Sequence, residues 1–228
     1  MNDKRFLLIM ICCFVSLQCW SQFGVKAKYN NNSYSAWEEA GIAVDHSNIE
    51  VGLDYWFKLK NHRIEFMPEV YYGLSTETTY PIAIGRELFL KQSYVGLQMN
   101  THIYIMDLES DCNCPTFSKD GPSIKKGFFI NIAPGAVFNM YDRNSGVTNV
   151  PNFSTQNINL RVALGVGYDI GINDLLTVTP FVNYLLSTGN NAEFFTPENQ
   201  EITSSWTSFQ GGVRVGFRPD YNNGLGGR

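Results

Sequence analysis

Apolar residues occur at every second position between Asn157 and Ser187. From Ile158 to Ile172 they alternate with small or polar residues, and after Asn173-Asp174 the alternation resumes from Leu176 to Leu186. A period of two is typical of β-strands, whose side chains point to opposite faces in turn. Strands of soluble proteins usually have about 5–6 residues, whereas a membrane-crossing strand needs about 9–11. The pattern therefore predicts a transmembrane hairpin with an apolar outer face and a polar inner face.

The same alternation recurs along the chain and predicts eight strands. Their approximate ranges are 23–30, 49–59, 64–74, 94–105, 127–141, 158–172, 176–186 and 205–218. The connections 31–47, 76–90, 142–156 and 188–203 are long, whereas those after the second and sixth strands are short. Long extracellular loops and short periplasmic turns are typical of outer-membrane barrels. We therefore expect an all-β fold, an eight-stranded antiparallel up-and-down transmembrane β-barrel with a filled lumen.

Outward aromatic residues fall into two bands in this arrangement. The band near the periplasmic rim contains Phe23, Tyr55, Phe57, Phe66, Phe128, Tyr168 and Phe217, and the band near the outer rim contains Tyr29, Tyr72, Phe138, Tyr184 and Phe209. Aromatic girdles at both membrane–water interfaces are a feature of transmembrane barrels.

Three prolines lie within predicted strands on the predicted lipid face. They are Pro68, Pro134 and Pro180. Because proline has no N–H to donate to a ladder, we expect a bulge or a local break at each. Their similar depth suggests a shared hairpin template.

The N-terminus has the pattern of a secretory signal. Lys4 and Arg5 precede an apolar stretch, residues 6–20, and Cys19 and Ser21 are the small residues at positions −3 and −1 if cleavage precedes Gln22. The stretch is shorter than the about 20 residues that a membrane-spanning helix needs. We expect a signal peptide (1–21), an outer-membrane barrel (22–218) and a flexible C-terminal tail (219–228).

Composition and charge fit an envelope protein. Charged residues make up 17% and aromatic residues 14% of the chain, and the net charge is −4. Removing residues 1–21 takes away Asp3, Lys4 and Arg5 and leaves 20 acidic and 15 basic residues, a net charge of −5. A mildly acidic chain without basic runs gives no case for nucleic-acid binding.

Charged residues gather at the predicted inward positions. The set comprises Lys26, Lys28, Glu50, Asp54, Lys58, Arg63, Glu65, Glu69, Arg161, Asp169, Arg214 and Arg218. We interpret it as a salt-bridged plug, in which pairing offsets the desolvation of each charge. The alternative is an ion path through a narrow transport barrel.

Cys112 and Cys114 lie in the connection between the fourth and fifth strands, Asp107 to Lys126, which is unusually long for a periplasmic turn. In an exported protein they can form a local disulfide that tightens the turn. A disulfide across one residue is strained and more reducible, which leaves a redox role or the docking of a periplasmic protein as alternatives. We predict no metal site, because no third or fourth ligand is nearby in sequence and His102 is predicted to lie inside the barrel.

Three segments resemble a known family. Phe23-Gly24-Val25-Lys26-Ala27, Met67-Pro68-Glu69-Val70-Tyr71 and the closing strand from Gly211 to Phe217 are similar to the outer-membrane β-barrel domain family of Gram-negative bacteria, the PorT-like porin group. The resemblance covers the mature chain and implies a location in the cell outer membrane. It supplies no activity.

The last predicted strand also fits the signal that the barrel-assembly machinery reads: a polar residue, a glycine and two apolar residues at fixed spacing. The matching residues are Gln210, Gly212, Val215 and Phe217. The chain departs from the usual pattern by continuing beyond Phe217.

The sequence gives little support for catalysis. Asp45-His46-Ser47 lies near the outer rim, but the chain has three histidines and no nucleophile motif. We therefore expect no enzyme and no cofactor, and favour a structural, adhesive or accessory barrel in the envelope, in contact with outer-membrane lipid. The alternatives are the narrow transport barrel and a soluble exported barrel of lipocalin type that binds a small apolar ligand.

Overall fold

The computed structural model describes residues 22–34, 46–59, 62–75, 78–83, 86–108, 122–145, 153–173, 175–188 and 206–217. The strands are β1 (Gln22–Tyr34), β2 (His46–Lys58), β3 (Ile64–Ser75), β4 (Thr78–Ala83), β5 (Arg86–Ile103), β6 (Phe128–Ser145), β7 (Phe153–Tyr168), β8 (Ile170–Gly171), β9 (Leu176–Thr188) and β10 (Trp206–Phe217), and the helix is α3 (Ser123–Gly127). The predicted signal peptide and tail lie outside these residues.

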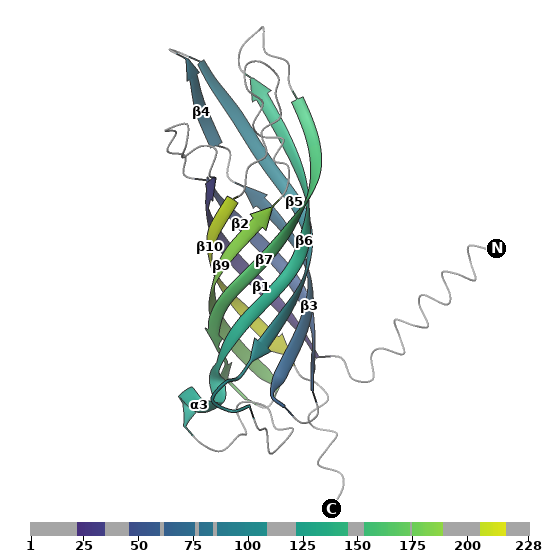
Figure 1. Cartoon of the computed structure of the whole chain (residues 1–228), viewed down its shortest axis with the longest axis vertical. Helices are drawn as coiled ribbons and strands as arrows, with labels where there is room; N and C mark the ends of the chain where they lie inside the picture. The colour runs from purple at the N-terminus through teal and green to yellow at the C-terminus, as the bar shows by residue number, and fades with distance from the viewer. Residues whose placement is uncertain are drawn as a thin grey trace, which may run out of the picture.

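The described strands form a closed antiparallel barrel (Figure 1). Eight of them follow one another round the wall in the order β10-β1-β2-β3-β5-β6-β7-β9, and β9 pairs with β10 to complete the circle. The closing ladder between β1 and β10 runs from Phe23↔Phe217 to Tyr34↔Trp206. β4 pairs only with β5, and β8 continues the line of β7. The predicted eight-stranded barrel is confirmed.

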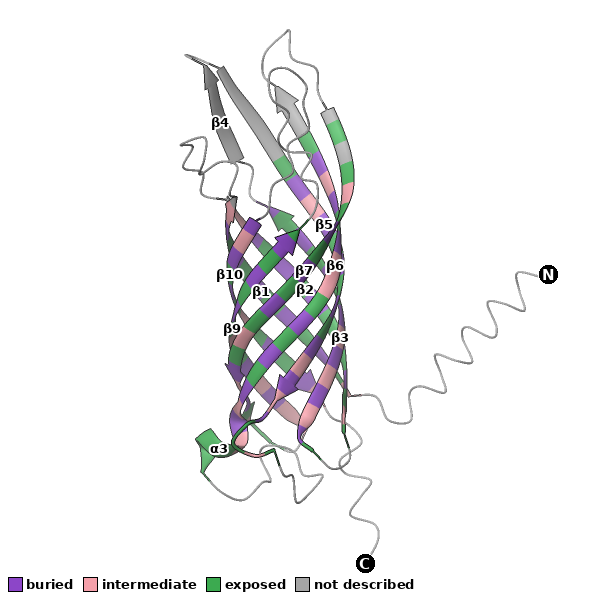
Figure 2. Cartoon of the chain, viewed as in Figure 1, coloured by how far each residue is buried: buried purple, intermediate pink, exposed green. Residues whose placement is uncertain are grey.

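Burial alternates along the strands that form the barrel wall, as Figure 2 shows where their burial is described. In β3 and β9 the pattern changes between buried and more exposed residues at nearly every step. The outward residues of β7 from Ile158 to Tyr168 are all apolar, whereas the inward residues include Asn159 and Arg161, each 1% exposed. A soluble lipid-carrying barrel needs an apolar interior to hold its ligand. The polarity found here is the reverse, which argues against the lipocalin-type alternative.

The predicted loops at the outer end contain paired strands. Residues 76–90 include β4 and the first part of β5, and the β5–β6 ladder extends to Leu88↔Ser145. The β6–β7 ladder likewise reaches Arg143↔Phe153, within the predicted loop 142–156. The prediction was wrong there because it relied on alternation. Where both faces of a strand meet water, no burial difference imposes a period of two.

The three prolines produce local breaks without a change of register. The β2–β3 ladder has pairs at Asp54↔Glu69 and Phe57↔Phe66 but none between them, opposite Pro68. Equivalent gaps face Pro134 in the β5–β6 ladder and Pro180 between β7 and β8, where the predicted strand 158–172 is interrupted. On its other side each proline stays paired. The reason is that proline gives no N–H to the strand it faces.

Two tyrosines pack over glycines of the neighbouring strand inside the barrel. Tyr71 pairs with Gly96, and Gly73 pairs with Tyr94. A Cβ atom at either glycine would overlap the facing tyrosine ring. The two rings meet edge to face at 6.3 Å and are nearly fully buried. These glycines therefore make room for aromatic filling of the lumen.

The end with short connections holds the turn between β2 and β3, the turn before β9, and helix α3 (Figure 1). Before β9, the side-chain oxygen of Asn173 accepts hydrogen bonds from the N–H groups of Leu175 (2.9 Å) and Leu176 (2.8 Å). This local side-chain bond replaces ladder pairing at the turn. No helix in the described part of the chain is long and apolar enough to cross a membrane.

Candidate functional site

The lumen holds a balanced set of buried charges. Among the described residues, five basic and five acidic side chains are buried: Lys26, Lys28, Arg63, Arg161, Arg214, Glu50, Asp54, Glu65, Glu69 and Asp169. Unpaired ions in an interior are strongly destabilising, so equal numbers of both signs are a condition for a dry, filled lumen. Ten of the twelve charged residues predicted to point inward lie in this set. Of the other two, Lys58 is only partly buried and Arg218 lies outside the described residues.

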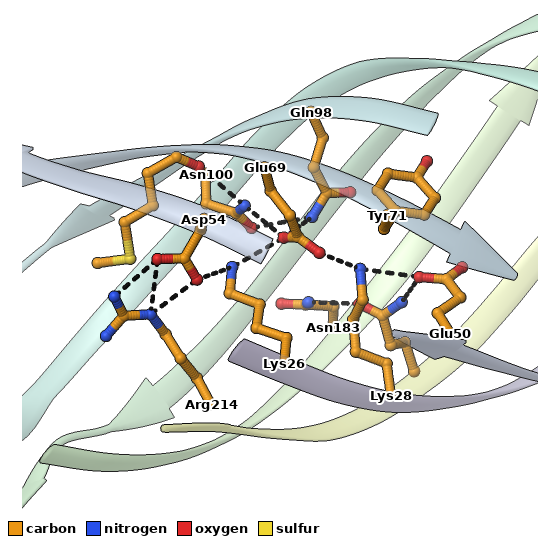
Figure 3. Close-up of polar contacts among 12 residues, drawn as sticks. Lys26, Lys28, Glu50, Asp54, Glu69, Tyr71, Gln98, Asn100, Asn183 and Arg214 are labelled. Atoms are coloured by element: carbon orange, nitrogen blue, oxygen red, sulfur yellow. Dashed lines mark hydrogen bonds and ion pairs between the residues drawn. The ribbon is translucent and has the colours of Figure 1, made fainter. Parts of the chain in front are cut away.

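Glu69 lies at the centre of one group of polar side chains in the lumen, as Figure 3 shows. Its carboxylate forms ion pairs with Lys26 at 2.8 Å and with Lys28 at 2.7 Å. It also accepts hydrogen bonds from the side-chain amides of Gln98 and Asn100, both at 2.9 Å. Four donors from β1 and β5 thus converge on one carboxylate of β3, and charge-assisted hydrogen bonds of this kind are among the stronger ones.

Glu50 and Arg161 join opposite walls of the barrel. Glu50 lies on β2 and Arg161 on β7, and three strands separate them in either direction round the wall. The Nη1 atom of Arg161 lies 2.7 Å from Oε1 of Glu50. Lys28 Nζ lies 2.8 Å from the other carboxylate oxygen, and the Tyr94 hydroxyl donates to Glu50 at 2.9 Å. A contact across the whole diameter means that side chains close the lumen at this level.

Two further groups fill the barrel towards the end with short turns. Arg214 donates from Nε and Nη2 to the two carboxylate oxygens of Asp54 at 2.7–3.0 Å. Deeper still, the Tyr104 hydroxyl bonds to Asp169 at 2.5 Å and to Glu65 at 3.2 Å. Polar side chains therefore form successive bonded groups along the length of the lumen.

The sequence pattern identified the charges but missed the amides that connect them. Gln210 donates to Asn30 at 2.7 Å and to Glu50 at 3.2 Å, and Asn183 donates to Gln210 at 2.9 Å. Their inward positions in the alternation were the available signal. An amide at an inward position can serve as donor and acceptor at once, so it links charged pairs that do not touch.

We predict that the purified protein forms no ion channel. Because Arg161 and Glu50 meet across the lumen, hydrated ions have no continuous path between the two ends. Planar-bilayer recordings of the wild-type protein should show no stepwise conductance. Regular conductance steps in the wild type, changed by Glu50→Gln, would contradict this prediction and support the transport alternative.

Arg63 ties together the two ends of the connection that carries the cysteines. Its Nη1 atom donates to Asp107 Oδ2 at 2.7 Å and to the main-chain oxygen of Lys126. Its main-chain N–H also bonds to the carbonyl of Leu108 at 3.0 Å. The connection therefore leaves and returns at one point below β3. Cys112 and Cys114 themselves lie outside the described residues.

The four residues predicted as an assembly signal lie on β10. Gln210 points into the lumen, and a Cβ atom at Gly212 would meet the Phe181 ring at 2.5 Å. Val215 is exposed on the outer wall, and Phe217 lies 5.6 Å from the ring of Phe23 on β1. Residues of this pattern thus also contribute to the ladder that closes the barrel.

The Asp45-His46-Ser47 segment is described only in part, whereas His102 is fully described. Asp45 lies outside the described residues, and nothing is described of the His46 side chain. His102 is buried and stacked on Phe129 at 3.8 Å, within the lumen as predicted.

Comparisons with known proteins concern the fold alone. No family model matches the chain, and no curated protein matches it. Among solved structures, Neisserial surface protein A is 12% identical, with a TM-score of 0.43 over 86% of this chain and 96% of that one. The N-terminal β-barrel domain of OprF from Pseudomonas aeruginosa is 11% identical, with a TM-score of 0.42 over 86% and 99%. Ail, the attachment invasion locus protein of Yersinia pestis, is 9% identical, with a TM-score of 0.43 over 86% and 97%. Similarities of this strength say nothing about activity, ligands or partners.

Proposed function

We propose that this chain is an integral outer-membrane β-barrel protein without enzymatic activity, of the PorT-like porin group, which serves the envelope as a structural, adhesive or accessory component. The observation that carries the proposal is the polarity of the closed barrel. Its outward residues in the middle of the strands are apolar, whereas its ten buried charges are balanced inside. In lipid every backbone polar group needs a partner within the protein, and closure of the sheet supplies it.

The apolar wall has the extent that a bilayer requires. On β2 the outward residues from Ile49 to Phe57 are all apolar and exposed, and on β7 the same holds for the even positions from Ile158 to Leu164. A large contiguous apolar surface is unusual in a soluble monomer. Insertion into lipid would cover it.

The proposal predicts heat-modifiable gel mobility. Protein extracted from the envelope should run faster unboiled than boiled, because a closed barrel resists unfolding by detergent until heated. The faster band should be found in the outer-membrane fraction. A single mobility, with the protein in the soluble periplasmic fraction, would overturn the proposal and favour a soluble barrel.

In the accessory role, the connection 107–126 is the segment that binds a periplasmic protein. Arg63 holds both ends of this connection at the rim of the barrel, through Asp107 and the carbonyl of Lys126. Cys112 and Cys114 lie between these two fixed ends in sequence, outside the described residues. A disulfide between them would pre-organise the segment for binding.

We expect the double variant Cys112→Ser/Cys114→Ser to lose cross-linking of this segment to a periplasmic protein, while its gel mobility stays heat-modifiable. The conservative variant Thr116→Ser in the same connection is the matched control and should behave as the wild type. Unchanged cross-linking and an unchanged envelope phenotype in the double variant would remove the docking role and leave the barrel assignment intact.

A further inference from the structure

Two of the proline gaps lie side by side in the barrel wall. Pro68 pairs with Met99 on β5 but faces the gap in the β2–β3 ladder. Met99 in turn stands opposite Pro134 in the gap of the β5–β6 ladder. The paired strands β3 and β5 are therefore flanked on both sides, at one level, by interrupted ladders. In the first gap the Met67 carbonyl accepts a hydrogen bond from the lumen side chain of Asn100 at 3.2 Å.

A hollow of about 640 Å³ lies on the outside of the wall at these gaps. Its volume falls within the about 300–1,000 Å³ of typical small-molecule sites. Its outward lining is apolar and comes from β2, β3, β5 and β6: Leu53, Tyr55, Pro68, Val70, Leu97, Met99 and Pro134. Both prolines of the ladder gaps, Pro68 and Pro134, are part of this lining.

The chemistry of the hollow excludes a charged ligand. Asp54, Glu69 and Gln98 also line it, but their side chains are buried and engaged in the lumen, with Asp54 on Arg214 and Glu69 on Lys26. Leu53, Val70 and Leu97 are 63%, 54% and 61% exposed on the lipid-facing side. An occupant must therefore be apolar and must reach the hollow from within the bilayer.

The level of the hollow points to one leaflet. Pro68 lies four residues after Ile64, the first residue of β3, which follows the short turn. Short turns of outer-membrane barrels face the periplasm. The hollow therefore opens in the half of the barrel that the periplasmic leaflet, which is made of phospholipid, would surround.

From the paired ladder gaps and the apolar hollow between them, we propose that this wall is a binding site for one acyl chain of a phospholipid in the periplasmic leaflet. The proposal rests on the membrane location proposed above. The hollow is shallow, but it brings apolar side chains of four strands within reach of one acyl chain. More contact area per chain means slower exchange of that lipid than of its neighbours.

Native mass spectrometry with dioleoyl-phosphatidylethanolamine as the probe tests the site. The wild-type barrel, released from detergent, should retain one molecule of this lipid. Val70→Trp places a large ring in the hollow and should lower the apparent affinity by roughly tenfold, because displacing two methylenes from contact has about this effect. The matched control is Val166→Trp, an outward valine on β7 between the unbroken pairs with Ile130 and Val182.

The outcomes separate this site from the membrane assignment. Retention by the wild type and by Val166→Trp, with loss in Val70→Trp, supports the site. Equal retention or equal loss in both variants overturns it, and so does preferential retention of lipid A, which belongs to the other leaflet. If all three proteins keep heat-modifiable mobility, such a result removes the lipid site and leaves the proposed membrane barrel standing.

Discussion

Glu69→Ala is expected to lower the free energy of unfolding of the barrel by about 3–5 kcal/mol, the range found when one partner of a buried ion pair is removed. Glu69 is 1% exposed and faces both Lys26 and Lys28. Its removal leaves two buried ammonium groups with one anion fewer. Lys28 keeps Glu50 at 2.8 Å, but among the carboxylates of the described residues Lys26 keeps only Asp54, at 3.8 Å.

The loss is measured by equilibrium unfolding in urea of the protein folded in phospholipid vesicles. Asp142→Ala is the matched control, because Asp142 is a carboxylate exposed at the outer end of β6. We expect that variant to stay within about 0.5 kcal/mol of the wild type. A difference below about 1 kcal/mol between the two variants would mean that the lumen is hydrated and that its ion pairs matter little.

Leu164→Arg should destabilise the folded barrel in vesicles by about 2–4 kcal/mol, as arginine does at the lipid-facing midplane of a barrel. Leu164 lies on β7, is 47% exposed and sits between Ile132 and Tyr184 of the adjoining strands. An arginine there faces hydrocarbon. In a soluble barrel the same change would place a charge in water and would be nearly neutral.

The matched control for this second prediction is Ser154→Arg. Ser154 is exposed on the same outward side of β7, beyond the apolar span that begins at Ile158. We expect no loss of stability and an unchanged yield in the outer-membrane fraction for this variant. Equal behaviour of the two arginine variants would count against a lipid-facing wall and against the proposed function as a whole.

The alternation of residues predicted the strands well where the outer wall is apolar. The predicted strands 64–74 and 176–186 correspond to β3 and β9 within one or two residues at each end. Burial on one side and an apolar outer surface on the other impose a strict period of two. Beyond the apolar span this constraint ends, and the alternation predicts loops where β4 and the outer parts of β5 and β6 are found.

The prolines also show what a sequence pattern can predict and what it cannot. Their sequence positions predicted a break at each, because the lack of an N–H is a local property of the residue. That Pro68 and Pro134 lie on either side of one residue, Met99, depends on which strands are neighbours and on their register. The hollow between them could therefore only be seen in the folded barrel.

The sequence by itself determined the strand-rich class, the approximate strand ranges and the face on which each side chain lies, because all three follow from the two-residue repeat. The tertiary structure alone decided which inward residues meet. Arg161 and Glu50 are 111 residues apart and touch only because ring closure and strand stagger bring β7 opposite β2 at the same height. The same holds for Arg63, which binds Asp107 and Lys126 across 44 and 63 residues. Contacts across a lumen are set by the geometry of closure, which no local pattern encodes.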